Sequence, residues 1–133
     1  MSVLLLAHVD PDGSLPKAGR EALTAAADVA RGLAVPLTVG LVSADVTAAA
    51  IGSCGATRFL GVSGAEFGEA RYVTDAAAAQ ALCVAAGADI VIAPATSRWL
   101  RVLAGVAQRL GGRADTHVTR VDASPAAVSV TRW

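Results

Sequence analysis

IVIAPATSRWLRVLAGVAQRLG, residues 90–111, predicts a buried β-strand that runs directly into an α-helix. Its first four residues are apolar, and the hydroxyl groups of Thr96 and Ser97 stand where a helix N-cap is expected. In an open α/β sheet, the N–H groups at such a helix start face the crevice beyond the carboxyl ends of the strands, where ligands bind. The stretch therefore predicts a parallel sheet and also marks a candidate site.

The same alternation of short apolar runs and longer helical patterns continues along the chain. Runs typical of strands covered on both faces are Val3–Ala7, Leu37–Val42, Arg58–Val62 and Ile90–Ala93. Helical patterns occupy 22–33, stopped by Pro36, and then Asp45–Cys54, Asp75–Ala86 and Ser97–Leu110. Gly61–Gly68 is predicted to be a long irregular loop. The chain closes with two β-rich pieces, Thr116–Val121 and Ala127–Arg132, which are expected to be paired or neighbouring strands. We therefore predict one three-layer, doubly wound α/β domain over residues 1–133, with a mostly parallel sheet, helices on both faces and strand order 3-2-1-4-5.

The composition excludes several classes of partner. Eleven basic residues balance eleven acidic ones and are scattered, so the sequence predicts neither nucleic-acid binding nor a polybasic membrane surface. The opening Met1–Leu6 has no basic segment, and its apolar run is too short for a signal peptide or a spanning helix. Cys54 and Cys83 are isolated and are predicted to be small buried hydrophobic residues. We therefore expect a cytoplasmic protein without membrane insertion.

The common phosphate-binding motifs are missing. The single lysine, Lys17, lies outside any Gly-x-x-x-x-Gly-Lys loop, which excludes a P-loop. No Gly-x-Gly-x-x-Gly follows the first strand, where Asp10–Gly13 predicts a turn instead. Gly61 and Gly64 resemble a nucleotide loop of the universal stress type, but they follow the third strand and lack the second glycine-serine pair. None of these motifs predicts a bound nucleotide.

Catalytic and metal-binding arrangements have no better support. The only histidines, His8 and His117, are not part of a recognisable nucleophile-base pair, and Gly-x-Ser-x-Gly is absent. Asp10 and Asp12 are close together, but in a Pro-Asp-Gly turn Asp binds its own backbone. The sequence therefore predicts no catalytic residue and no metal site.

The residues that could line the crevice come from the ends of the first and fourth strands. They are His8, Val9, Thr96, Ser97 and Arg98. For His8 the alternative is a hydrogen-bonded residue at the rim.

Two features of the helix after residue 97 leave alternatives open. Arg98, Arg101 and Arg109 predict a solvated helix face, although Arg98 stands near enough to the crevice to meet an anion. Trp99, in the first turn, either packs beneath a neighbouring loop or lies at an interface, where an exposed Trp99 would permit self-association.

Several segments, taken together, resemble the alpha subunit of electron transfer flavoproteins. They are VLLLAHVD at 3–10, GSLP at 13–16, ADIVIAPATS at 88–97, VAQRLG at 106–111, THVT at 116–119 and Thr131-Arg132. The segments follow the order of the family and cover essentially the whole chain. The Ala-Thr-Ser at 95–97 and the Ala-x-Arg-Leu-Gly that follows it are the most specific.

The resemblance implies the N-terminal domain of that subunit, with a fold shared with adenine-nucleotide alpha hydrolases. In the family, a separate C-terminal domain of the alpha subunit holds most of the FAD contacts, and we expect that domain to be absent from this chain. The implied partners are that flavin-binding domain, the beta subunit of a heterodimer, and acyl-CoA or other dehydrogenases reached through the complex. The beta subunit binds AMP in many members, so AMP is implied here only by analogy. The implied role is a scaffold in an electron carrier, not an enzyme; the alternative is a free-standing adenine-nucleotide-binding module.

The chain departs from the family pattern near the candidate crevice. Trp99-Leu100-Arg101 replaces a Gly-Arg-Asp group, and Ala104-Gly105 replaces Pro-Arg. His117 stands in place of an Asp, and His8 in place of a Glu. The departures favour a helix end that supports an interface over one that holds a cofactor.

Overall fold

The computed structural model describes residues 2–9, 15–43, 58–64, 72–115, 118–124 and 127–132. In chain order the elements are β1 (Val3–His8), α1 (Lys17–Leu33), β2 (Leu37–Ser43), β3 (Arg58–Ser63), α2 (Tyr72–Ala86), β4 (Ile90–Ile92), α3 (Ser97–Arg109), β5 (Val118–Ser124) and β6 (Ala127–Arg132). The expected helix over Asp45–Cys54 lies outside the described residues.

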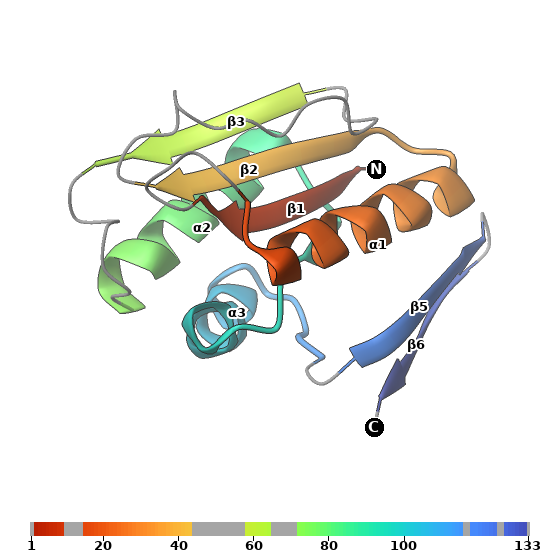
Figure 1. Ribbon diagram of the computed structural model, residues 1–133. Helices are drawn as coiled ribbons and strands as arrows, with labels where there is room; N and C mark the ends of the chain where they lie inside the picture. The colour runs from red at the N-terminus through yellow and green to blue at the C-terminus, as the bar shows by residue number, and fades with distance from the viewer. Residues whose placement is uncertain are drawn as a thin grey trace.

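The first four strands form one parallel sheet in the order β3-β2-β1-β4. Figure 1 shows β3, β2 and β1 side by side. β1 is central, because its Val3 pairs with Leu37 of β2 on one side and with Ile90 of β4 on the other. Every residue from Val3 to Ala7 is fully buried. A strand buried on both faces has no reason to alternate polar and apolar residues, which explains the continuous apolar run in the sequence.

Helices cover both faces of this sheet and make three layers. Val3, Leu5 and Ala7 of β1 belong to one core cluster with α1, whereas Leu4 and Leu6 belong to a second cluster with α2 and α3. The two clusters follow from the period of two in a strand, which sends successive side chains to opposite faces. The predicted fold class and the order of the first four strands are confirmed.

The helix boundaries follow local signals in the sequence. α1 begins after Pro16, ahead of the predicted 22–33, and ends at Leu33, where Ala34 adopts a left-handed conformation with φ 56°. The Ala34 N–H donates to the carbonyls of Ala30 and Arg31, which closes the helix before Pro36. α2 begins three residues before the predicted Asp75 and ends at Ala86 as expected. None of the helices within the described ranges is long and apolar enough to span a membrane.

The structure corrects two sequence predictions. β5 does not lie beside β4 as a fifth strand of the main sheet; it pairs with β6, as expected of the last two strands, and the antiparallel pair forms a separate two-stranded sheet. Val121 and Ala123 of β5 pack against the α1 cluster, so the hairpin buries its apolar face on that helix. The predicted loop at 61–68 starts later than expected, because β3 continues through Ser63 in register with Ser43, and residues 65–68 lie outside the described residues.

The hairpin approaches α1 closely at Gly32. A β-carbon on Gly32 would lie 2.9 Å from the carbonyl carbon of Ala123, so the backbone of β5 would have to move. We expect Gly32→Ala to lower the free energy of unfolding by about 1–3 kcal/mol, the usual cost of overpacking, despite the better helix propensity of alanine. Urea denaturation followed by circular dichroism measures it. A variant as stable as the wild type would show that the hairpin can shift freely.

Gly105 of α3 provides a matched control. The atoms nearest to a β-carbon there all belong to the side chain of Tyr72, whose hydroxyl oxygen would clash with it and whose side chain is 41% exposed. Because the tyrosine can turn aside, we expect Gly105→Ala to raise the free energy of unfolding by about 0.5–1 kcal/mol.

Candidate functional site

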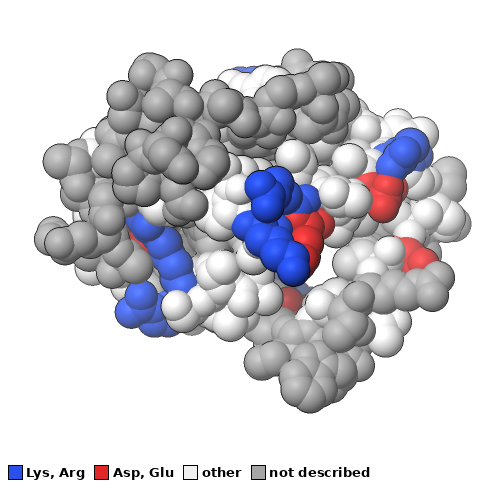
Figure 2. All heavy atoms as spheres, viewed as in Figure 1, with Lys and Arg blue, Asp and Glu red and all other residues white. Residues whose placement is uncertain are grey.

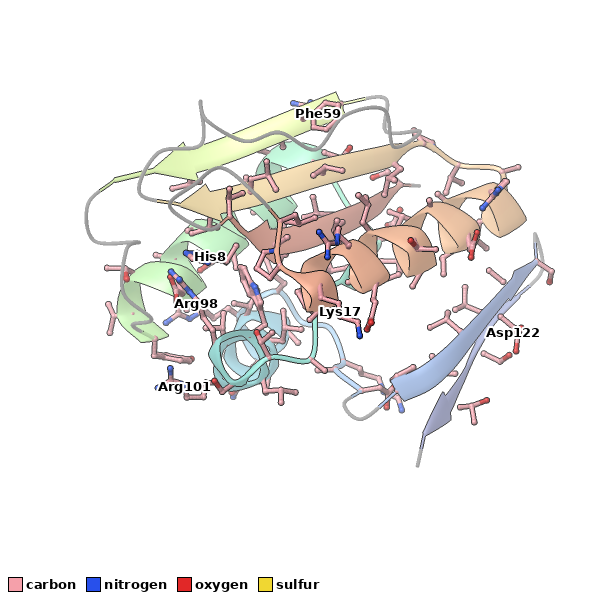
Figure 3. The ribbon with its side chains drawn as sticks, in the orientation of Figure 1. His8, Lys17, Phe59, Arg98, Arg101 and Asp122 are labelled. Atoms are coloured by element: carbon pink, nitrogen blue, oxygen red, sulfur yellow. The ribbon has the colours of Figure 1, made fainter. Side chains whose placement is uncertain are left out.

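The candidate site lies at the carboxyl edge of the parallel sheet. His8 is the last residue of β1 and is half-buried, and the N–H of the buried Val9 donates to the Val42 carbonyl at 3.1 Å. β1 and β4 are parallel, and Leu5 of β1 pairs with Ile92 of β4. His8, at the end of β1, and Thr96, four residues after Ile92, therefore both lie at this edge. Figure 3 shows His8 and Arg98 at the same end of the sheet.

The start of α3 matches the sequence prediction. Thr96 is the N-cap, with extended backbone angles, and its Oγ1 accepts a hydrogen bond from the Trp99 N–H at 3.5 Å. Its carbonyl accepts from the Leu100 N–H at 2.9 Å, and Ser97 is exposed as the first residue of the helix. The predicted strand-to-helix junction is therefore confirmed.

Arg98 is held by a carboxylate of the same chain. Its Nε and Nη2 donate to Oδ2 and Oδ1 of Asp75, both at 2.7 Å, in a bidentate pair. Asp75, in the first turn of α2, is 1% exposed, and the Arg98 side chain is 11% exposed. The prediction of a solvated face is correct for Arg101 and Arg109 and wrong for Arg98. The anion beside Arg98 is the Asp75 carboxylate.

Trp99 belongs to the core. It is 1% exposed and lies in the cluster formed by α2, α3 and the sheet, so the packing alternative holds and Trp99 offers nothing to a surface contact. Its Nε1 is buried and has no hydrogen-bond partner among the described residues. A buried N–H without an acceptor costs about 1–3 kcal/mol.

Sequence reasoning missed Asp75 as a partner of Arg98. The signal was present, because Asp75 is the only charged residue in YVTDAAAAQALCVAA, residues 72–86. A carboxylate in an otherwise uncharged buried helix requires a cation. The sequence could not identify which of several arginines supplies it.

A cavity of about 250 Å³ lies elsewhere, among α2, α3 and the start of β4. Apolar side chains such as Cys83, Val91 and Leu103 line it together with Asp89 and Arg113. The Asp89 N–H donates to the carbonyl of Ser2, which precedes β1, so the cavity opens at the amino edge of the sheet and is separate from the crevice.

The remaining predicted residues are placed as follows. Cys83 is buried and unbridged as predicted, and burial raises the pKa of its thiol. Asp10, Asp12, Cys54 and His117 lie outside the described residues.

In the part of the chain that the structure describes, no three His, Cys, Asp or Glu side chains are grouped to hold a metal ion. On the face shown in Figure 2, the basic side chains are scattered.

The N-cap allows a direct test of the helix start. We expect Thr96→Ala to lower the free energy of unfolding by about 0.5–2 kcal/mol, because the Trp99 N–H loses its acceptor. Thr96→Ser keeps the hydroxyl and is the control. Equal stability of the alanine and serine variants in urea denaturation would contradict the capping role.

A parallel sheet covered on both faces, with a capped helix beyond the carboxyl end of β4, defines an open α/β domain of the doubly wound class. A family model described as electron transfer flavoprotein domain matches residues 3–133. The chain therefore belongs to the electron transfer flavoprotein family, whose members are flavin-associated electron carriers. No match was found among curated proteins or among solved structures.

Proposed function

We propose that the chain is the N-terminal domain of an electron transfer flavoprotein alpha subunit and acts as a scaffold and interaction domain. The family match over residues 3–133 supports a role in such a complex. The alpha-subunit assignment is supported by the resemblance of residues 88–97 and 106–111 to that subunit. In this proposal the complete complex, located in the cytoplasm, passes electrons from acyl-CoA or other dehydrogenases to the respiratory chain or another acceptor. Its other parts are the beta subunit and a flavin-binding domain.

The observation that carries the scaffold role is the pairing of Arg98 with Asp75. An FAD pyrophosphate would need cationic side chains and free N–H groups at the crevice. The Arg98 guanidinium donates through Nε and Nη2 to the buried Asp75 carboxylate, and the Thr96 hydroxyl is used in capping. The described crevice residues therefore do not fit a dinucleotide phosphate. The proposal places FAD in the separate flavin-binding domain and assigns no bond chemistry to this chain.

Flavin absorbance tests this proposal. The isolated 133-residue chain is expected to purify without flavin and to gain none after incubation with FAD and gel filtration. When it is mixed with the beta subunit and the flavin-binding domain, we expect a complex that contains FAD. Stoichiometric FAD on the isolated chain would overturn the scaffold role, and so would failure to form the complex.

A second candidate is a free-standing module that binds an adenine nucleotide. It is favoured by the α3 N-terminus beyond β4, where Ser97 is exposed. The crevice would then be lined by His8, Val9, Thr96, Ser97 and Arg98. Millimolar AMP, ADP or ATP should raise the melting temperature through linkage, with adenosine as the control without phosphate. The absence of any shift would reject this candidate.

A further inference from the structure

The cavity of about 250 Å³ among α2, α3 and the start of β4, which we call the amino-edge cavity, has an apolar floor. Cys83 of α2 and Val106 of α3, which are 5% and 3% exposed, line it together with the half-buried Val91 and Leu103. A molecule that enters can therefore bury an aliphatic group against these side chains. Pockets for drug-sized ligands have volumes of about 300–1,000 Å³, so this cavity suits a smaller molecule.

Two helices end at the amino-edge cavity. At the end of α2, the Ala88 N–H donates to the Cys83 carbonyl at 3.3 Å, and at the end of α3, the Gly112 N–H donates to the Ala107 carbonyl at 2.7 Å. All four residues of these two hydrogen bonds line the cavity. The carboxyl end of a helix carries roughly half a negative elementary charge, because its last carbonyls have no partner within the helix. Two such ends at one cavity favour a positively charged ligand.

The charged side chains at the cavity add to this preference. Asp89, Arg113 and Asp115 line it, so two carboxylates stand against one guanidinium. All three residues are exposed, which places their charges at the rim. A carboxylate can accept several hydrogen bonds, so the contacts that Asp89 and Asp115 already make within the chain do not exclude a further donor. The rim and the helix ends together are complementary to a cation.

We propose that the amino-edge cavity binds a small aliphatic monoamine in its protonated form. The aliphatic part lies on the apolar floor, and the ammonium group donates to the carboxylates of Asp89 and Asp115 at the rim. Arg113 repels a second positive charge, which selects a monoamine over a diamine. This site lies at the edge of the sheet opposite the crevice, and it does not rest on the proposed function.

The test measures the binding of isopentylamine to the 133-residue chain at neutral pH, where an alkylamine is protonated like a lysine side chain. Isopentyl alcohol and isovalerate have the same aliphatic part and are the neutral and anionic controls. The amine is expected to raise the melting temperature and, in titration calorimetry, to bind at least about tenfold more tightly than either control. No binding of the amine, or equal binding of the amine and the alcohol, would overturn the proposal.

Charge substitutions locate the ammonium group. Asp89→Asn with Asp115→Asn removes both carboxylates of the rim and is expected to raise the dissociation constant of the amine by about tenfold or more. Asp28→Asn with Asp122→Asn is the matched control, because it removes two exposed carboxylates from α1 and β5, which pack together on the other face of the sheet. The control is expected to change the dissociation constant by less than about twofold. If both double variants bind the amine as tightly as the wild type, the proposal is wrong.

A substitution that fills the cavity locates the aliphatic part. Ala107 lines the cavity, and Ala107→Leu is expected to abolish detectable binding of the amine. Ala104→Leu is the matched control, because it makes the same change at an exposed position of α3 outside the lining residues, and it should bind the amine like the wild type. Circular dichroism verifies that each variant is folded. Equal binding by the two folded leucine variants would contradict the site, and if Ala107→Leu does not fold, the charge substitutions decide.

Discussion

Replacing Asp75 by alanine is expected to lower the free energy of unfolding by about 3–5 kcal/mol, the usual cost of removing one partner from a buried ion pair. The Arg98 guanidinium would keep its position at 11% exposure and lose both hydrogen bonds. Urea denaturation at neutral pH measures the loss. Glu21→Ala is the matched control, because its pair with Lys17 is exposed at 84% and 68% and contributes about 0–1 kcal/mol.

A second substitution separates the ion pair from packing. Asp75→Leu combined with Arg98→Met replaces both charges by apolar groups, and this double variant should be more stable than Asp75→Ala. A double-mutant cycle should give a coupling energy of at least about 2 kcal/mol. If the effects of Asp75→Leu and Arg98→Met on the free energy of unfolding were additive, the ion pair would not link α2 to α3.

Trp99→Ala is expected to lower the free energy of unfolding by about 3–5 kcal/mol, because it leaves a large cavity between α3 and the sheet. Trp99→Phe keeps a ring and removes the N–H that has no acceptor among the described residues. It should therefore cost much less than the alanine substitution.

The comparison of the two Trp99 variants also tests the buried N–H itself. Circular dichroism in urea is the measurement, since both variants lose the indole of Trp99 and its fluorescence. If Trp99→Phe were as destabilising as Trp99→Ala, the Trp99 Nε1–H would be donating an important hydrogen bond. The description of this N–H as lacking an acceptor would then be wrong.

The parallel sheet was predictable because its evidence is local. Continuous apolar runs such as Val3–Ala7 indicate strands buried on both faces, and a hydroxyl before an apolar helical period, as at Thr96, marks a helix start. The order of the first four strands followed from short connections and right-handed crossovers. The pairing of the last two strands was expected, but their position was not, because a β-rich segment carries no signal for whether it extends the parallel sheet or packs against α1.

The candidate site was predictable in position and not in its interactions. The edge that carries His8 and Thr96 follows from the strand ends. Whether Arg98 meets a ligand, the solvent or Asp75 depends on how close α2 lies to α3, and residues 75 and 98 are far apart in the sequence. The two alternatives for Trp99 were equally open, because an aromatic residue in a first turn has the same local signature in a core and at an interface.

The sequence by itself determined the class of the fold, the capped helix after β4 and the resemblance to electron transfer flavoproteins, because these depend on periodicity and on short segments. Tertiary structure decided which charges neutralise one another, which aromatic ring is buried and which helix keeps an apolar side in solvent. Those outcomes depend on distances between residues remote in the chain. In a buried site, where the dielectric constant is low, such distances decide large electrostatic and desolvation energies. The pair of Asp75 with Arg98 and the exposure of Val73 and Val84 on α2 are therefore properties of the folded protein.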